Sequence, residues 1–126
     1  MITFAAISIW IVLGALALFQ GSLALGAPLG RFAWGGQHRV LPTSLRISSV
    51  VSIVIYALVA AVVLARISTS SLGVPAGIIA VAIWVVAGYF LLGIGMNLAS
   101  KSKAERSVMP AVSAVLCVLC VVVALR

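Results

Sequence analysis

The stretch ITFAAISIWIVLGALALFQGSLAL, residues 2–25, contains no charged residue. A helix needs about 20 predominantly apolar residues to cross the hydrocarbon core of a bilayer, and this stretch is long enough. A secretory signal would begin with basic residues and have a shorter apolar core, whereas the first basic residue here is Arg31. We therefore expect a membrane-spanning helix that is retained in the protein.

Three further apolar runs follow, at approximately residues 42–65, 75–98 and 108–125. Only 7% of the 126 residues are charged and 65% are hydrophobic, whereas a soluble domain carries about a quarter charged residues. The sequence thus predicts an all-α fold, a single transmembrane domain formed by a bundle of four transmembrane helices. Four short helices bury little interior, so a homo-oligomer is also expected.

Basic residues are distributed unevenly between the two sides of this predicted bundle. The side of the first and third connections carries Arg31, Arg39, Arg46, Lys101, Lys103 and Arg106, and the opposite side carries Arg66 and Arg126. Because Lys and Arg are enriched in cytoplasmic loops, loops 26–41 and 99–107 are expected in the cytoplasm and both termini outside. Orientation and anionic lipid headgroups account for the net charge of +7, so no nucleic-acid partner is expected.

The first connection, GAPLGRFAWGGQHRVLP at residues 26–42, is the most distinctive part of the sequence. Glycine permits backbone conformations that other residues resist, and proline stiffens a turn. The residues expected to shape the loop are Gly26, Pro28, Gly30, Gly35, Gly36 and Pro42. Arg31, His38 and Arg39 would then converge on an anion such as a lipid phosphate. The alternative is an interfacial turn in which Trp34 lies among the headgroups and the arginines only set the topology.

Glu105 is the only acidic residue of the chain. With Ser102 it fits the S-x-x-E capping box, in which the serine caps a helix and the glutamate returns to the serine backbone. Pro110 is expected to break or kink that short helix before the fourth span. The alternative is an ion pair between Glu105 and an arginine of the first loop. A metal site is not expected, because His38 is the only histidine and Glu105 the only carboxylate.

Polar residues within the spans are few. No Asp, Glu, Lys, Arg or His lies at the middle of a span, which argues against a proton-coupled antiporter. The second span carries a row of hydroxyl groups, which either form a polar seam or bond to their own helix: Ser48, Ser49, Ser52 and Tyr56. Gly93 and Gly95 are expected to let a neighbouring helix approach, and Asn97 to bond across helices. Cys117 and Cys120 have no nearby basic residue to stabilise a thiolate, so we interpret them as packing residues.

Two loop motifs extend this interpretation: GAPLGRFAWGG with LPTSLR at residues 26–46, and M-N-x-x-S-x-S-x-x-E-R at residues 96–106. Together they resemble a family of small, four-span bacterial inner-membrane proteins whose activity is uncharacterised. The resemblance covers nearly the whole chain. It implies the bacterial inner membrane and the four-helix layout, and it brings no catalytic residues and no cofactor.

The function expected from these features is non-enzymatic binding or passage of a lipid-like or anionic small molecule at the cytoplasmic mouth of the bundle. The candidate ligand-binding residues are Arg31, Trp34, His38, Arg39, Arg46, Asn97, Glu105 and Arg106. Membrane lipids are the expected partners. One alternative is an accessory subunit of a larger membrane complex, suggested by the uncharged spans. Another is an intramembrane enzyme with His38 and Glu105 as its acid and base.

Overall fold

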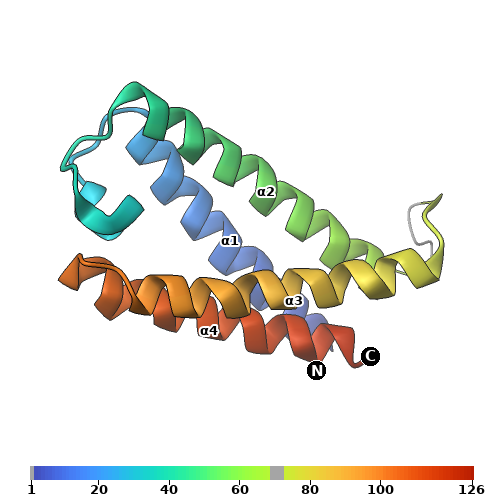
Figure 1. Ribbon diagram of the computed structural model, residues 1–126. Helices are drawn as coiled ribbons and strands as arrows, with labels where there is room; N and C mark the ends of the chain where they lie inside the picture. The colour runs from blue at the N-terminus through green and yellow to red at the C-terminus, as the bar shows by residue number, and fades with distance from the viewer. Residues whose placement is uncertain (1, 69–72) are drawn as a thin grey trace.

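The computed structural model describes residues 2–68 and 73–126. Four long helices, α1 (Ile2–Ala24), α2 (Thr43–Ile67), α3 (Ala76–Leu98) and α4 (Lys103–Ala124), follow one another in antiparallel order (Figure 1). Two short 3₁₀ turns, η1 (Gly30–Phe32) and η2 (Trp34–Gly36), lie between α1 and α2. Each long helix is apolar enough to cross a membrane. The protein is an all-α, multi-pass membrane protein with a four-helix bundle, as the sequence predicts.

Three of the helices begin and end within two residues of the predicted bounds, but α4 does not. It begins at Lys103 rather than near residue 108 and continues without interruption through Pro110. The predicted break at Pro110 is therefore wrong. Proline removes the hydrogen bond to the carbonyl four residues earlier, and its ring crowds that carbonyl. That residue, Arg106, is exposed near the helix start, where water can take the place of the missing N–H.

The helices pair as two hairpins, α1 with α2 and α3 with α4, and α1 also packs against α4. At the end where both chain termini lie, the terminal end, side chains from all four helices form an apolar core. Its most buried members are Ala6, Ile9, Val63, Ile83, Cys120 and Val123. The indole N–H of Trp10 donates to the carbonyl of Ala60 at 3.3 Å. Cys120 is fully buried within this core and neither cysteine forms a disulfide, in line with a packing role.

Arg66 closes the terminal end. Its guanidinium donates hydrogen bonds to the carbonyl oxygens of Ala124 at 2.9 Å and Arg126 at 3.2 Å. Arg126 in turn donates to the carbonyl of Arg66 at 3.0 Å. These bonds satisfy carbonyls that the last turn of α4 leaves without a helical partner. The connection between α2 and α3 includes residues 69–72, which lie outside the described residues.

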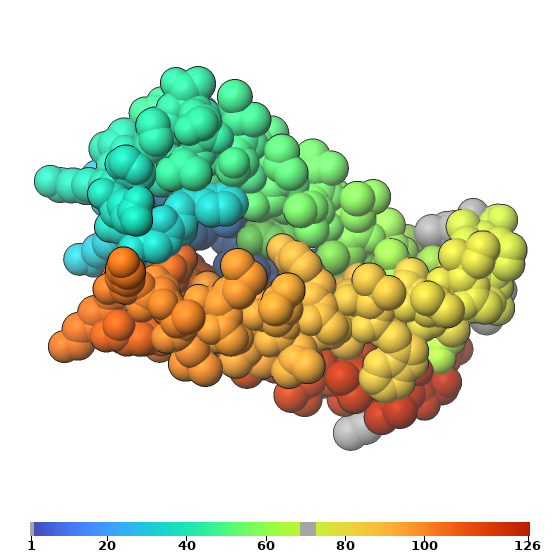
Figure 2. All heavy atoms as spheres, viewed as in Figure 1, coloured from blue at the N-terminus to red at the C-terminus, as the bar shows by residue number. Residues whose placement is uncertain are grey.

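At the opposite end, the loop end, the two hairpins diverge. Figure 1 shows α2 and α3 close together near the terminal end and far apart near the loop, with the segment that contains η1 and η2 folded between them. In the space-filling view of Figure 2 the surface is hollowed between α2 and α3, below this segment. The bundle is therefore packed at one end and open along one side of the other.

Candidate ligand-binding pocket

The first loop is a compact turn that depends on its glycines. The N–H of Gly30 donates to the carbonyl of Arg39 at 2.9 Å, and a Cβ on Gly30 would lie 1.8 Å from the carbonyl oxygen of His38. Trp34, Gly35 and Gly36 follow with φ angles of 53°, 76° and 70°, in the left-handed region that favours glycine. Glycine at positions 35 and 36 lets the chain reverse within a few residues and return toward α4.

Two side chains attach this loop to α2. The indole N–H of Trp34 donates to the hydroxyl of Ser49 at 3.3 Å, and the Nε–H of Arg46 donates to the carbonyl of Leu41 at 2.8 Å. Ser49 is fully buried. Arg46, a predicted ligand-binding residue, thus holds the chain entering α2.

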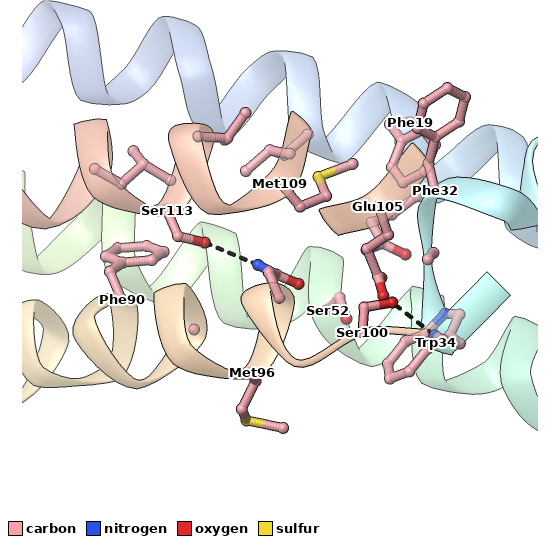
Figure 3. Close-up of a pocket in the computed structure, with 18 of the residues that line it drawn as sticks. Phe19, Phe32, Trp34, Ser52, Phe90, Met96, Ser100, Glu105, Met109 and Ser113 are labelled. Carbon is pink, nitrogen blue, oxygen red and sulfur yellow. Dashed lines mark hydrogen bonds between the residues drawn. The ribbon is translucent and has the colours of Figure 1, made fainter. Parts of the chain in front are cut away.

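Glu105 attaches the loop to α4. Its backbone N–H donates to the hydroxyl of Ser102 at 3.4 Å, so the serine caps the helix as predicted. The carboxylate, however, does not return to the backbone of Ser102, because that N–H donates to the hydroxyl of Ser100. It accepts a hydrogen bond from the N–H of Gly35 at 3.3 Å instead (Figure 3). Only half of the capping box is present.

The alternative interpretation of Glu105, an ion pair with an arginine of the first loop, is not what the structure shows. Within the described part of the chain no basic side chain pairs with it, and its partner in the loop is a backbone amide. The hydroxyl of Ser102 adds a second connection by donating to the carbonyl of Arg31. The two loops are therefore joined, but through the backbone of the first loop rather than its cations.

A pocket of about 640 Å³ lies beneath this segment, between the diverging hairpins. All four long helices and the first loop contribute to its wall. The polar residues of the wall are Gln20, Gln37, Ser52, Tyr56, Tyr89, Asn97, Ser100, Glu105 and Ser113, and its apolar residues include Phe19, Trp34, Phe90, Met96, Met109 and Leu116. Figure 3 shows Phe19, Trp34, Ser52, Glu105 and Ser113 arranged around it. Polar and apolar groups together suit an amphiphilic molecule.

Gln20 is the least satisfied polar side chain of this wall. It is only 8% exposed, and its Nε2 donates to the hydroxyl of Tyr56 at 3.4 Å. Its carbonyl oxygen Oε1 is buried without any hydrogen-bond partner among the described residues. Leaving a buried acceptor unpaired costs about 1–3 kcal/mol, and the fold carries this cost because the oxygen is enclosed by protein atoms.

The pocket is open to the side and closed below. Met96 and Leu92 of α3 line it while remaining 66% and 64% exposed, so they form its rim toward the lipid. Phe90 and Leu116 line its deep end and are almost fully buried. Eleven residues of helix separate Glu105 from Leu116, or ~16 Å, and the hydrocarbon core is ~30 Å thick. The pocket therefore reaches through about one leaflet.

The predicted ligand-binding residues separate into two groups. Trp34, Asn97 and Glu105 line the pocket, together with the loop-shaping Gly35. The cationic candidates lie elsewhere. Arg31 and Arg39 line a separate depression of about 470 Å³ on the loop surface, together with Pro28 and Gly36.

Two further candidates also lie outside the pocket. His38 is exposed. Arg106 is exposed and donates to the carbonyl of Ser100 at 3.2 Å. Among the residues that the structure describes, no three His, Cys, Asp or Glu side chains are placed to hold a metal ion.

Sequence reasoning missed several residues of the pocket, chiefly Gln20, Phe90, Met96 and Met109. Gln20 had one available signal, a lone amide in an uncharged span. Asn97 bonds across helices as predicted, since its Nδ2 donates to the hydroxyl of Ser113 on α4 at 3.1 Å. The close approach that permits this bond occurs at Gly93, where a Cβ would lie 3.3 Å from that hydroxyl.

The fold and the site define a class: a small multi-pass membrane protein with a pocket that opens sideways in the loop half of its bundle. Comparison of the chain with models of known families, with curated proteins and with solved structures gives no significant match. The function therefore has to be argued from the site.

Proposed function

We propose that this protein binds a lipid-like amphiphile in the pocket between α2 and α3. The observation that carries the proposal is the composition of the wall. Asn97, Ser100 and the one carboxylate, Glu105, line the loop end, while Phe90 and Leu116 line the deep end together with Tyr56 and Tyr89. An amphiphile lying parallel to the lipids would place its head group near the first loop and its apolar body along the helices.

Binding accounts for the architecture better than passage does. The deep end of the pocket meets the apolar core, and Phe90 and Leu116 belong to both. Between these residues and the terminal end, all four helices contribute closely buried side chains. A solute crossing the membrane would have to displace this core, whereas a molecule entering from the side would not.

The orientation we propose follows the basic residues. Arg31, Arg39, Lys101 and Lys103 are exposed at the loop end, and exposed cations of short loops face the cytoplasm. The pocket would then open into the inner leaflet, and the motifs of the two loops favour the bacterial inner membrane. A homo-oligomer stays a prediction that blue-native electrophoresis in mild detergent can test.

The depression at Arg31 and Arg39 supports a second candidate. Two exposed guanidinium groups beside Pro28 and Gly36 form a surface to which an anionic lipid headgroup would be attracted, by about 1 kcal/mol for each cation near the surface. We propose this as a contact with bulk anionic lipids, separate from the occupant of the pocket. Arg31→Gln with Arg39→Gln should weaken adsorption to anionic vesicles and leave pocket binding unchanged.

Native mass spectrometry of the protein from gently solubilised membranes tests the principal proposal. We expect a retained molecule of amphiphilic composition. Ser52→Phe fills the pocket from α2 and should abolish the adduct. Val51→Phe is the matched control, because Val51 is the neighbouring residue, is 51% exposed and does not line the pocket. A bare protein, or an adduct equally abundant in both variants, would reject pocket binding.

A further inference from the structure

We infer that the head group recognised in this pocket is a protonated amine that retains its N–H donors, carried on an apolar chain. This inference rests on the proposed function and narrows it from an amphiphile in general to a cationic one. It reverses the sequence-based expectation of an anion for the pocket itself, because the arginines on which that expectation depended do not line it.

The charge of the pocket wall favours a cationic head group. Glu105 is 8% exposed and is the one charged residue among the described residues that line the pocket. The N-terminal turn of α4 offsets part of its charge, equivalent to roughly half a unit. No lysine, arginine or histidine on the described lining offsets the remainder. A buried carboxylate favours a cationic partner over a neutral one, and an anion would be repelled.

The hydrogen-bonding capacity of the pocket wall favours a head group that has N–H donors. The side chain of Glu105 accepts one bond, from Gly35, although a carboxylate can accept about four. Its carboxylate therefore has capacity for about three more hydrogen-bond donors. A primary ammonium supplies three N–H donors and one positive charge, whereas a quaternary ammonium supplies the charge alone.

The Glu105 carboxylate predicts a ranking among four probes with the same chain: dodecylamine, dodecyltrimethylammonium, dodecanol and dodecanoate. The protein is held in phosphatidylcholine nanodiscs, and radiolabelled dodecylamine is displaced by each unlabelled probe. The concentration of each probe is expressed as molecules of probe per lipid molecule, so that partition into the bilayer does not enter the comparison. We expect dodecylamine to bind about tenfold more tightly than dodecanol, and dodecanoate to bind least. Dodecyltrimethylammonium should fall between the amine and the alcohol.

A substitution of Glu105 and a matched control variant test this ranking. Glu105→Gln keeps the shape of the side chain and an acceptor for the Gly35 N–H, so the loop stays attached. It should weaken dodecylamine about tenfold and change dodecanol less than about twofold. Thr43→Lys, at the exposed first residue of α2, raises the net charge by the same unit outside the pocket and should change neither.

The outcomes separate this inference from the proposed function. Equal affinity for amine and alcohol, together with loss of both in Ser52→Phe, would overturn the amine assignment and leave amphiphile binding standing. No Ser52-sensitive binding of any probe would overturn both. If the trimethylammonium binds as well as the amine, the requirement for N–H donors is wrong. If phosphatidylethanolamine in the nanodisc displaces dodecylamine, the natural amine is a membrane lipid. If it does not, the natural amine is a free hydrophobic amine, and either result fits the inference.

Discussion

Replacing Gly36 by alanine tests the contact between the first loop and the start of α4. Gly36 has a φ of 70°, so alanine would be strained there by ~1 kcal/mol. A Cβ would also lie 2.3 Å from the Cβ of Ser102 and 2.6 Å from its hydroxyl. Ser102 would have to move, and its cap of α4 and its bond to Arg31 would be lost, at ~1 kcal/mol each.

Gly35→Ala is the matched control. Gly35 has a φ of 76°, and no atom lies within 4 Å of the place that a Cβ would take, so alanine there suffers the backbone strain without the collision. The two variants should therefore differ by ~2 kcal/mol, which corresponds to a factor of roughly 30 in an opening equilibrium.

Hydrogen exchange in nanodiscs, followed by mass spectrometry, measures this difference at the amides of Glu105 and Arg106, which bond to Ser102. We expect Gly36→Ala to accelerate their exchange roughly 30-fold beyond Gly35→Ala. Adding Ser102→Gly to Gly36→Ala should cost little more, because that contact is already broken. Equal exchange in the two glycine variants would refute the packing of the loop on α4.

Three further predictions concern the rest of the bundle. Asn97→Leu and Ser113→Ala should show a coupling of ~0.6 kcal/mol in a double-mutant cycle of unfolding in sodium dodecyl sulfate, and additive effects would mean that the bond between α3 and α4 does not form. Arg66→Gln should lower the free energy of unfolding by ~1–2 kcal/mol, since charge-assisted bonds to the last carbonyls of α4 are lost, whereas Arg106→Gln, with one exposed bond, should change it by less than ~0.5 kcal/mol. In a cysteine-free background, Lys101→Cys should react with an impermeant maleimide in inside-out vesicles and stay unlabelled in spheroplasts; labelling in spheroplasts would reverse the proposed orientation.

The four spans could be predicted because each is an apolar run long enough to cross a bilayer. The start of α4 could not be found in this way. Apart from Ala104, residues 103–107 are polar or charged, so hydropathy excludes them, although Ser102 caps a helix there. The Ser102–Glu105 pattern correctly indicated the cap. It could not indicate the partner of the carboxylate, because Gly35 is distant in sequence and offers only its backbone.

The pocket depends on how the hairpins diverge, which is a tertiary property without a local sequence signal. A lone amide such as Gln20 can face lipid, a neighbouring helix or a cavity, and a single sequence does not distinguish these positions. The hydroxyls of the second span were more informative. Ser52 and Tyr56 do line the pocket, and Ser52 also bonds to the carbonyl of Ser48, so both interpretations of that row hold at once.

The sideways opening has a consequence for how the pocket discriminates between molecules. A ligand that arrives from the leaflet has already left water, and lipid tails are as apolar as leucine side chains. The hydrocarbon chain of the ligand therefore moves from one apolar environment to another and gains little free energy by entering the pocket. A longer hydrocarbon chain would raise the concentration of the ligand in the membrane without raising its affinity for the protein within the membrane. Affinity measured against the aqueous concentration would mostly report partition into the bilayer, and the few polar atoms beneath the first loop would decide which membrane-dissolved molecule stays.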